Sequence, residues 1–339
     1  MSRSEPDRYV HHTLGERFHI LRPLAAGGMS HVYLARDERS EDPTAHVAVK
    51  ILAGKRRNEA MLERMRREAV ALERLDHPNI VKTLGHGRTD DGGYFIAMEL
   101  VDGPSITEFI KVHHPDHEGV LRLLTQVCSA LRHAHRKGLV HRDLKSSNLL
   151  VATDAHGRAR VKLIDFGIVK LPDEESLSGH HELVGSVHTI SPEQVKGEPL
   201  DHRADIYAVG ILAYRMLAGE YPYHSRVATE TITQHVHAEV PLLDDPELPP
   251  GLAQLVARCM AKDPADRFPD VQALMDELSD ILDVPTAAFT KPLKGPPVVA
   301  SLAPAPPSAP SAAPTSSSRM LALAGVALLA AAALFWVLT

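Results

Sequence analysis

The stretch His141-Arg142-Asp143-Leu144-Lys145-Ser146-Ser147-Asn148 decides the fold of this chain. It lies between an apolar segment that ends at Val140 and a second apolar run, Leu149-Leu150-Val151. A carboxylate, an ammonium and an amide follow one another at offsets of two and five residues. This spacing fits a turn that presents all three groups to one phosphate and one hydroxyl. The stretch therefore predicts a phosphate-handling loop between two apolar segments.

A second motif, Asp165-Phe166-Gly167, begins seventeen residues after Asn148. The first stretch has the form H-R-D-L-K-x-x-N, and together the two resemble the catalytic loop and the magnesium-binding motif of the eukaryotic-like Ser/Thr protein kinases of bacteria. The resemblance implies an α+β, two-lobed protein kinase fold. In that fold a small β-rich N-terminal lobe with one helix precedes a larger, mainly helical C-terminal lobe.

The pattern from Phe18 to about Leu34 is typical of strands and is interrupted at Ala25-Ala26-Gly27-Gly28-Met29-Ser30. A glycine-containing turn lets backbone amides approach phosphate oxygens, because a missing Cβ removes the steric barrier. Followed by Val47-Ala48-Val49-Lys50, the turn resembles the Gly-rich loop and the third-strand lysine of kinases. The first and third glycine positions of the G-x-G-x-x-G pattern hold Ala25 and Ser30 here.

Lys50 lies in a half-buried, strand-like run, where an unpaired ammonium would be costly, so it needs anionic partners. The segment from Asn58 to Leu75 has apolar residues on one face with the 3.6-residue period of a helix. Glu68 lies on this helix at the position where the family places the glutamate that pairs with the strand lysine. We therefore expect an ion pair between Lys50 and Glu68.

A further strand is predicted from Tyr94 to Val101, and Asp102-Gly103-Pro104 ends it. The resemblance implies that this is the hinge between the lobes, with Met98 as the gatekeeper and the backbone of Glu99 and Val101 bound to the adenine edge. The residues expected to contact ATP are Leu24, Ala25, Ala26, Gly27, Gly28, Met29, Ser30, Val32, Ala48, Lys50, Met98, Glu99 and Val101.

Phosphoryl transfer to a hydroxyl needs an oriented nucleophile, metal ions that spread the phosphate charge, and donors to the transferred group. The resemblance implies that Asp143 orients the substrate hydroxyl, that Asn148 and Asp165 hold Mg²⁺, and that Lys145 neutralises the γ-phosphate. Carboxylate and amide oxygens are hard ligands that suit a hard cation. Lysine two residues after the catalytic aspartate is the Ser/Thr form of the loop, so we expect Ser and Thr acceptors.

The run Gly185-Ser186-Val187-His188-Thr189-Ile190-Ser191-Pro192-Glu193 resembles the end of a protein kinase activation segment. Ser186 stands where a threonine is usual and keeps a hydroxyl able to bridge Asp143 and Lys145. Thr189 stands where the family usually has tyrosine. The resemblance thus places Ser186 in the substrate loop.

Two structural contacts also follow from the resemblance. Glu193 is expected to form a buried ion pair with Arg267, which lies in Asp263-Pro264-Ala265-Asp266-Arg267-Phe268. Asp205 is expected to cap the backbone of the catalytic loop from a core helix.

Arg142, directly before the catalytic aspartate, implies control by phosphorylation, because in the family such an arginine recognises a phosphorylated activation segment. Ser178 lies eight residues before Ser186 and is the expected phosphosite, with Ser176 as second choice. The alternative is that residues 173–179 form only a mobile acidic loop.

The composition changes at Val284, after which Pro, Ala and Ser dominate as far as Ser318, which predicts a disordered linker. Met320 to Leu338 contains nineteen residues without a charge, enough to cross a hydrocarbon core of about 30 Å. Arg319 precedes this span, which places the kinase in the cytoplasm by the positive-inside rule. The expected boundaries are an N-terminal extension 1–17, a kinase domain 18–283 with lobes 18–101 and 102–283, a linker 284–318 and a transmembrane helix 319–339.

A net charge of −6 and a pI near 6.4 argue against nucleic acid as the main partner. Cys128 and Cys259 are far apart in helix-like apolar contexts, so no disulfide framework is predicted. The doublets His11-His12, His113-His114 and His180-His181 do not have the spacing of a helical zinc site, and we expect them at the surface.

The sequence thus predicts a Ser/Thr protein kinase that uses ATP and Mg²⁺, acts on protein substrates and autophosphorylates by self-association. We expect it to be anchored in the cell membrane by a single helix, with the kinase domain in the cytoplasm. Two alternatives stay open. One is a membrane-anchored pseudokinase scaffold, motivated by Ala25 and Thr189. The other is a small-molecule phosphotransferase, disfavoured by Ser191-Pro192-Glu193 and by Arg267.

Overall fold

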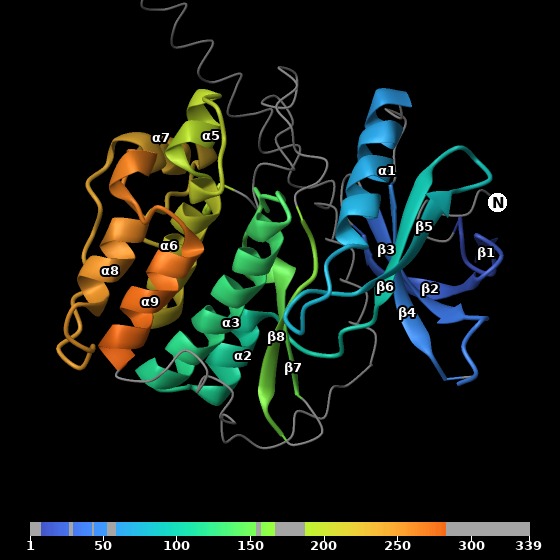
Figure 1. Cartoon of the computed structure of the whole chain (residues 1–339), viewed down its shortest axis with the longest axis horizontal. Coiled ribbons are helices and arrows are strands. Elements are labelled where there is room, and N and C mark those ends of the chain that lie inside the picture. Colours follow the sequence, from blue (N-terminus) through green and yellow to red (C-terminus); the bar gives the residue numbers. More distant parts are fainter. Residues whose placement is uncertain are drawn as a thin grey trace, which may run out of the picture. The chain divides into compact units, whose positions relative to one another are not determined.

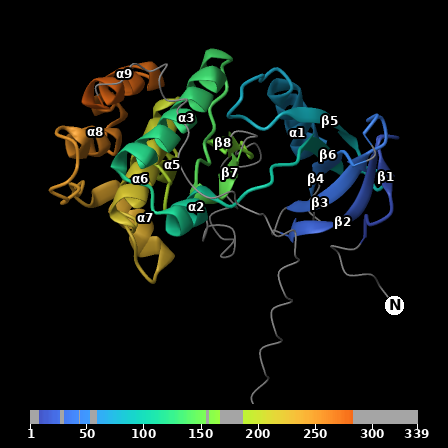
Figure 2. The same cartoon turned by 90° about the horizontal axis from the view of Figure 1, so that it is seen from below.

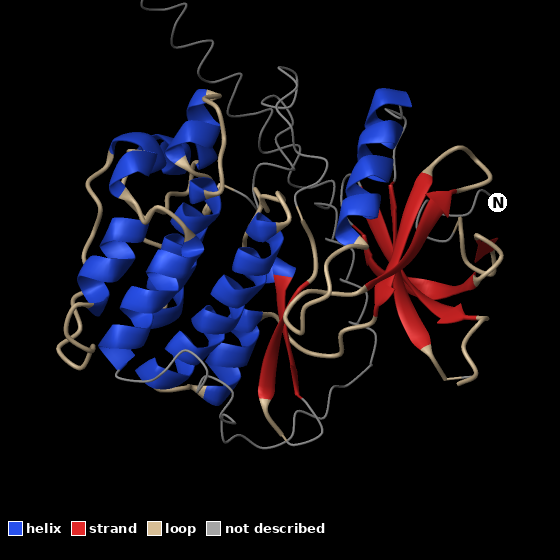
Figure 3. Cartoon of the chain, viewed as in Figure 1, coloured by secondary structure: helices blue, strands red, loops and turns tan. Residues whose placement is uncertain are grey.

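The computed structural model describes residues 8–26, 30–42, 44–52, 59–153, 157–166 and 187–282 (Figure 1). The strands of the first hundred residues form one sheet, whereas most helices belong to the second half of the chain (Figure 3). This arrangement confirms the two-lobed α+β fold. The predicted linker and membrane helix lie outside the described residues. Among the helices that are described, none has both the length and the apolar composition that a membrane crossing requires.

The N-terminal lobe is an antiparallel sheet with the strand order β1-β2-β3-β4-β6-β5, and helix α1 packs against β5 and β6. Register places Lys50 opposite Val32 on one side and Ile96 on the other, so these three side chains share one face. The opposite face buries Tyr33 and Val49 in an apolar cluster. The bounds are β1 Thr13–Leu14, β2 Phe18–Ala26, β3 Ser30–Asp37, β4 His46–Leu52, α1 Glu59–Leu72, β5 Thr83–Arg88 and β6 Tyr94–Glu99.

Residues 8–17, which precede the predicted kinase domain, pack on this sheet. β1 pairs with β2, and the side chains of Tyr9 and Leu14 are buried in the apolar cluster. The Tyr9 hydroxyl donates to the Asp91 carboxylate at 2.8 Å, and Arg8 pairs with the same carboxylate at 2.8 Å. These residues therefore contribute to the core of the N-terminal lobe.

The C-terminal lobe is built around α6, which is buried along most of its length and packs against α3 and α8. Asp116 caps α3, and an apolar stripe along α3 faces α6. A Cβ on Gly210 of α6 would lie 2.6 Å from the Cβ of Cys259, so only glycine permits this close approach of α6 and α8. The bounds are α2 Ile106–His113, α3 His117–Arg136, β7 Leu149–Thr153, β8 Ala159–Leu163, α5 Pro192–Lys196, α6 Arg203–Ala218, α7 Ala228–His237, α8 Leu252–Cys259 and α9 Val271–Leu282.

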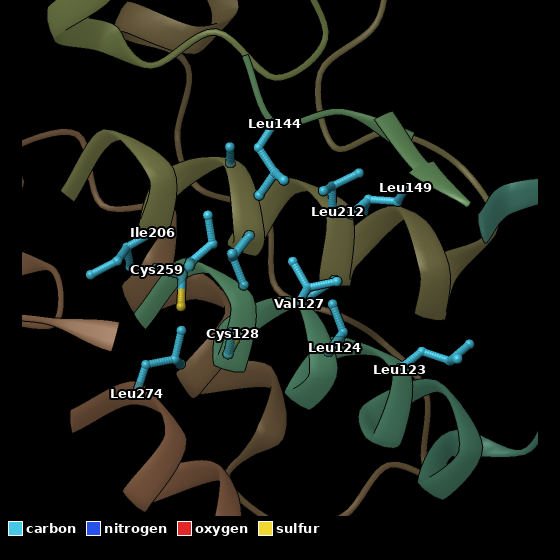
Figure 4. Packing of buried hydrophobic residues seen from close by; sticks show 14 of the residues in the cluster. Leu123, Leu124, Val127, Cys128, Leu144, Leu149, Ile206, Leu212, Cys259 and Leu274 are labelled. Atoms are coloured by element: carbon cyan, nitrogen blue, oxygen red, sulfur yellow. The ribbon is translucent and has the colours of Figure 1, made fainter. Parts of the chain in front are cut away.

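Cys128 and Cys259 are free and buried in this core, close to Leu274 (Figure 4). Burial raises the pKa of the Cys128 thiol to about 12, so the thiol stays protonated and behaves as a small apolar group. The surface prediction for the histidine doublets is confirmed at His11-His12 and at His114, which are exposed, whereas His113 is half-buried. His180-His181 lie outside the described residues.

The β7–β8 hairpin lies between α3 and the N-terminal sheet (Figure 2). Leu163 of β8 bridges to Ile80, which precedes β5, and the Val81 amide donates to the Leu163 carbonyl at 2.9 Å. The hairpin thereby connects the two lobes at the place where the predicted site residues converge.

Candidate active site

The backbone of the catalytic loop, residues 141–148, is held by Asp205 of α6. One carboxylate oxygen accepts from the His141 amide and the other from the Arg142 amide, each at 2.8 Å. Burial alone would raise the pKa of Asp205. The hydrogen bond from His135 and the charge and backbone amide of His141 outweigh burial and leave this pKa below its ordinary value. The predicted cap on the catalytic loop is confirmed.

Arg142 adopts a left-handed backbone conformation, with φ of 64°. A side chain larger than glycine is strained there, so the surrounding structure must hold the turn. The Asp205 bond to the Arg142 amide fixes one side, and Gln194 Nε2 donates to the Arg142 carbonyl at 2.8 Å on the other. The loop is thus fixed from α6 and from α5.

Asp143 is buried, and the other predicted catalytic groups of the loop surround it. Lys145 Nζ lies 3.0 Å from its Oδ2. Asn148 Nδ2 donates to the Asp143 carbonyl at 2.9 Å and lies 3.4 Å from Oδ2. The structure therefore brings the predicted base, the predicted phosphate partner and one predicted metal ligand together.

Lys50 and Asp165 connect the two lobes across the site. Lys50 Nζ donates to both carboxylate oxygens of Asp165, each at 2.7 Å. The anionic partner of Lys50 in the described part of the chain is thus Asp165, which was not the partner expected from the sequence. The side chain of Glu68 lies outside the described part of the chain, so its pairing with Lys50 remains a prediction.

The residues predicted to hold Mg²⁺ have suitable donors and neighbouring positions. The Ile164 amide donates to the Asn148 carbonyl at 3.0 Å, which places Asn148 beside the residue that precedes Asp165. Asn148 uses its amide nitrogen on Asp143, which leaves its amide oxygen for a cation. An amide oxygen and a carboxylate suit Mg²⁺.

Met98, the predicted gatekeeper, lines a mainly apolar pocket between the sheet, α1 and the residues that follow β8. Glu99 ends β6, and its amide donates to the Lys82 carbonyl at 2.9 Å. A Cβ on Gly103 would lie 2.2 Å from the Val151 carbonyl oxygen, so the hinge (residues 99–103) passes close to β7. The lining residues of the pocket are Lys50, Met65, Leu72, Val81, Thr83, Ile96, Met98, Ile164, Asp165 and Phe166.

The strands that were predicted to cover the nucleotide are only partly described. Leu24 and Ala25 are exposed at the end of β2, and Ala25 pairs with Val32 of β3. Ala48 follows on β4, opposite Met98. Residues 27–29, the tip of the predicted Gly-rich loop, lie outside the described residues.

The end of the predicted activation segment is anchored as expected. Arg267 donates to both carboxylate oxygens of Glu193, at 2.7 and 2.8 Å, and both side chains are buried. This confirms the predicted pair. Thr189 is buried at the position where tyrosine is usual. Residues 167–186, including Ser176, Ser178 and Ser186, lie outside the described part of the chain.

Three residues that contact the site or the hinge were not predicted from the sequence. Gln194 donates to the Arg142 carbonyl, and His135 Nε2 lies 2.8 Å from Asp205 Oδ2. Lys162 forms an ion pair with the carboxylate of Glu99, a hinge residue. His135 lies six residues before His141 on the helix that leads into the loop, which is the one signal for its role. The partners of Gln194 and Lys162 are distant in sequence, so no local pattern marks them.

A comparison with family models matches residues 18–278 to the protein kinase domain. The chain is 35% identical over 291 residues to the Serine/threonine-protein kinase pkn3 of Myxococcus xanthus, covering 83% of this chain and 53% of the relative. It is 35% identical to PrkC of Bacillus subtilis, in an alignment that covers 79% of this chain and 41% of the relative. It is also 35% identical to PknL of Mycobacterium tuberculosis, where the alignment covers 80% of this chain and 67% of the relative. Both are also named serine/threonine-protein kinases. The chain spans about half the length of the first two relatives.

Proposed function

This chain belongs to the protein kinase domain family, and on that premise we propose that it transfers the γ-phosphate of ATP to Ser and Thr hydroxyls of proteins. The observation that carries the proposal is the assembly around Asp143. Its carboxylate lies beside Lys145 and Asn148 in a loop that Asp205 fixes, and the Lys50–Asp165 pair closes the other side. The names of the relatives support Ser and Thr as acceptors.

Each residue has a task that its chemistry suits. Asp143 accepts the proton of the substrate hydroxyl or orients that hydroxyl for attack. Lys145 offsets negative charge on the transferred phosphate, because an ammonium is a compact partner for phosphate. Asn148 and Asp165 would hold Mg²⁺, which spreads the phosphate charge when it is bound. Lys50 holds the Asp165 carboxylate through two hydrogen bonds, and its ammonium suits the nucleotide phosphates.

Neither alternative function is favoured. A pseudokinase scaffold has no need of Lys50, Asp143, Asn148 and Asp165 together, and the relatives are named as kinases. A small-molecule phosphotransferase is disfavoured because the buried Glu193–Arg267 pair belongs to the end of a protein kinase activation segment.

The direct test uses the purified full-length chain with radiolabelled ATP, Mg²⁺ and a general protein substrate. The wild type should label Ser and Thr, as read by phosphoamino acid analysis. Lys50→Met and Asp143→Asn should label far less. Equal label from all three proteins would refute the kinase proposal, and label on tyrosine would refute the acceptor class.

Control by phosphorylation is the second part of the proposal. Arg142 directly precedes the catalytic aspartate, and a phosphoserine at Ser178 or Ser176 would supply the anion that its guanidinium can bind. Autophosphorylation between two associated copies would supply that modification. Mass spectrometry of active protein should find phosphate on one of these serines, and active protein without it would refute this control.

Anchoring in a membrane is the third part. The uncharged run from Met320 to Leu338 and the preceding Arg319 support a single span with the kinase domain in the cytoplasm. The full-length chain should stay in the membrane fraction after alkaline extraction, whereas a chain ending at residue 318 should be released. Release of both chains would refute the anchor.

A further inference from the structure

The end of strand β8 and the two residues that follow it contact several parts of the proposed site. Two positions after Lys162, the Ile164 amide donates to the Asn148 carbonyl at 3.0 Å. The next residue, Asp165, accepts from Lys50 Nζ at 2.7 Å. Lys162 therefore lies two and three residues before the positions that contact Asn148 and carry Asp165, the two proposed metal ligands.

The hinge is tied to the same strand through one carboxylate. Lys162 Nζ donates to Oε1 of Glu99, the last residue of β6. The same oxygen accepts from the Lys82 amide at 3.1 Å, while the Glu99 amide donates to the Lys82 carbonyl at 2.9 Å. Beside Lys82, the Val81 amide donates to the Leu163 carbonyl at 2.9 Å. These bonds form a closed ring that joins the sheet of the N-terminal lobe to the hairpin of the C-terminal lobe.

The burial of this pair separates it from ordinary surface pairs. The side chain of Lys162 is 16% exposed and that of Glu99 is 33% exposed, compared with 43% and 39% for Arg36 and Glu38. A partly buried pair is screened less by salt than an exposed one. Glu99 still reaches water, so the carboxylate can be hydrated when its partner is removed. Loss of Lys162 should therefore loosen the hinge without unfolding the chain.

We propose that Lys162 is a positioning residue for the bound nucleotide. Its ion pair with Glu99 sets the hinge backbone relative to Asn148 and Asp165, so that one ATP molecule can reach the hinge with its adenine and the metal ligands with its phosphates. The proposal rests on the proposed kinase function. It adds that the distance between the adenine end and the phosphate end of the site is controlled from β8.

The test measures the affinity of the full-length chain for a non-hydrolysable ATP analogue with Mg²⁺, together with the transfer rate at saturating ATP. Lys162→Met should raise the dissociation constant by about three- to tenfold, the range expected for a coupled contact of about 1 kcal/mol. The transfer rate at saturation should stay within about threefold of the wild type, because the groups around Asp143 are untouched. Arg36→Met, which removes an exposed pair, is the matched control and should change neither value.

Charge reversal distinguishes the ion pair from mere packing. Lys162→Glu should weaken nucleotide binding more than Lys162→Met does, and the double variant Lys162→Glu, Glu99→Lys should restore most of the affinity. Glu99→Gln keeps an acceptor for the Lys82 amide and should raise the dissociation constant as Lys162→Met does. Equal affinity of the wild type, Lys162→Met and Glu99→Gln would overturn the proposal, as would a double variant no better than Lys162→Glu. A wild type that binds the analogue but transfers no phosphate would instead overturn the proposed function, and the affinity comparison would still decide the role of Lys162.

Discussion

The two sides of the proposed site are built in different ways. On the C-terminal side, buried side chains hold the catalytic loop: Asp205 binds two of its amides and Gln194 binds the Arg142 carbonyl. On the N-terminal side, Leu24 and Ala25 are exposed, and Ala25 pairs with Val32 of β3 beside a register shift in the strand pairing. The difference teaches that the groups for chemistry are fixed by core side chains. The groups that cover the nucleotide depend instead on backbone geometry.

The largest expected effect tests the side that performs the chemistry. Asp143→Asn keeps the size of the side chain and its contact with Asn148 but removes the carboxylate that accepts the hydroxyl proton. Transfer at saturating ATP should fall about 10²–10⁴-fold. Nucleotide affinity and the thermal midpoint should stay near wild-type values, and a comparable loss of affinity would contradict the separation of the two sides.

The second prediction concerns the anchor of the activation segment. Arg267→Met leaves the Glu193 carboxylate buried without a partner, which should cost about 3–5 kcal/mol of unfolding free energy. Urea denaturation measures this loss. Lys196→Met is the matched control, because Lys196 lies on the same helix as Glu193 and its pair with Glu198 is exposed. The control should lose no more than about 1 kcal/mol, and equal losses would contradict the role of the buried pair.

The third prediction compares a buried histidine with an exposed one. His235 is fully buried, and burial lowers its pKa from 6.5 to about 3. As the pH falls below about 6.5, the unfolded chain takes up a proton at His235 while the folded chain does not, so stability decreases. This difference in proton binding at His235 should lower the free energy of unfolding by about 2–3 kcal/mol between pH 6.5 and pH 4.5.

Urea denaturation across this pH range provides the test. His235→Asn should make the free energy of unfolding depend less on pH, whereas His12→Asn, at an exposed position, should leave that pH dependence unchanged. A steep dependence that persists in His235→Asn would show that other groups cause it.

The smallest expected effect concerns Ala25, at the first glycine position of the kinase pattern. Among the described residues, a positive φ occurs at His11, Glu16, His114 and Arg142 outside glycine, and Ala25 is not one of them. Because Ala25 continues strand β2 with an ordinary φ, glycine brings no conformational advantage there. Ala25→Gly should change the KM for ATP by less than about twofold, and a tenfold decrease would show that Ala25 limits nucleotide binding.

The fold and the grouping of the loop residues could be predicted from the sequence, because those residues follow one another within short motifs. His141 to Asn148 form one loop, and Asp165 lies two residues after the β7–β8 hairpin that follows this loop, so local order implies proximity. Asp205 and the Glu193–Arg267 pair were predicted because the family motifs place them.

What the sequence could not predict depends on contacts between distant segments. Lys162 and Glu99 are 63 residues apart and carry no motif of their own, so only the folded backbone brings them together. The ion pair between Lys50 and the Asp165 carboxylate was likewise not predicted, because the sequence motif indicated only a metal ligand at Asp165. A residue with an assigned role can still make a second contact that no local pattern shows.

Amide hydrogen exchange with and without an ATP analogue and Mg²⁺ tests the difference between the two sides most directly. The amides of His141 and Arg142, bonded to Asp205 at 2.8 Å, should exchange slowly and equally in both samples. The Val101 amide in the hinge should become protected only when the nucleotide is bound. Fast exchange at His141 and Arg142 that slows on nucleotide binding would contradict the account, because the catalytic loop would then be ordered by the nucleotide and not by the core.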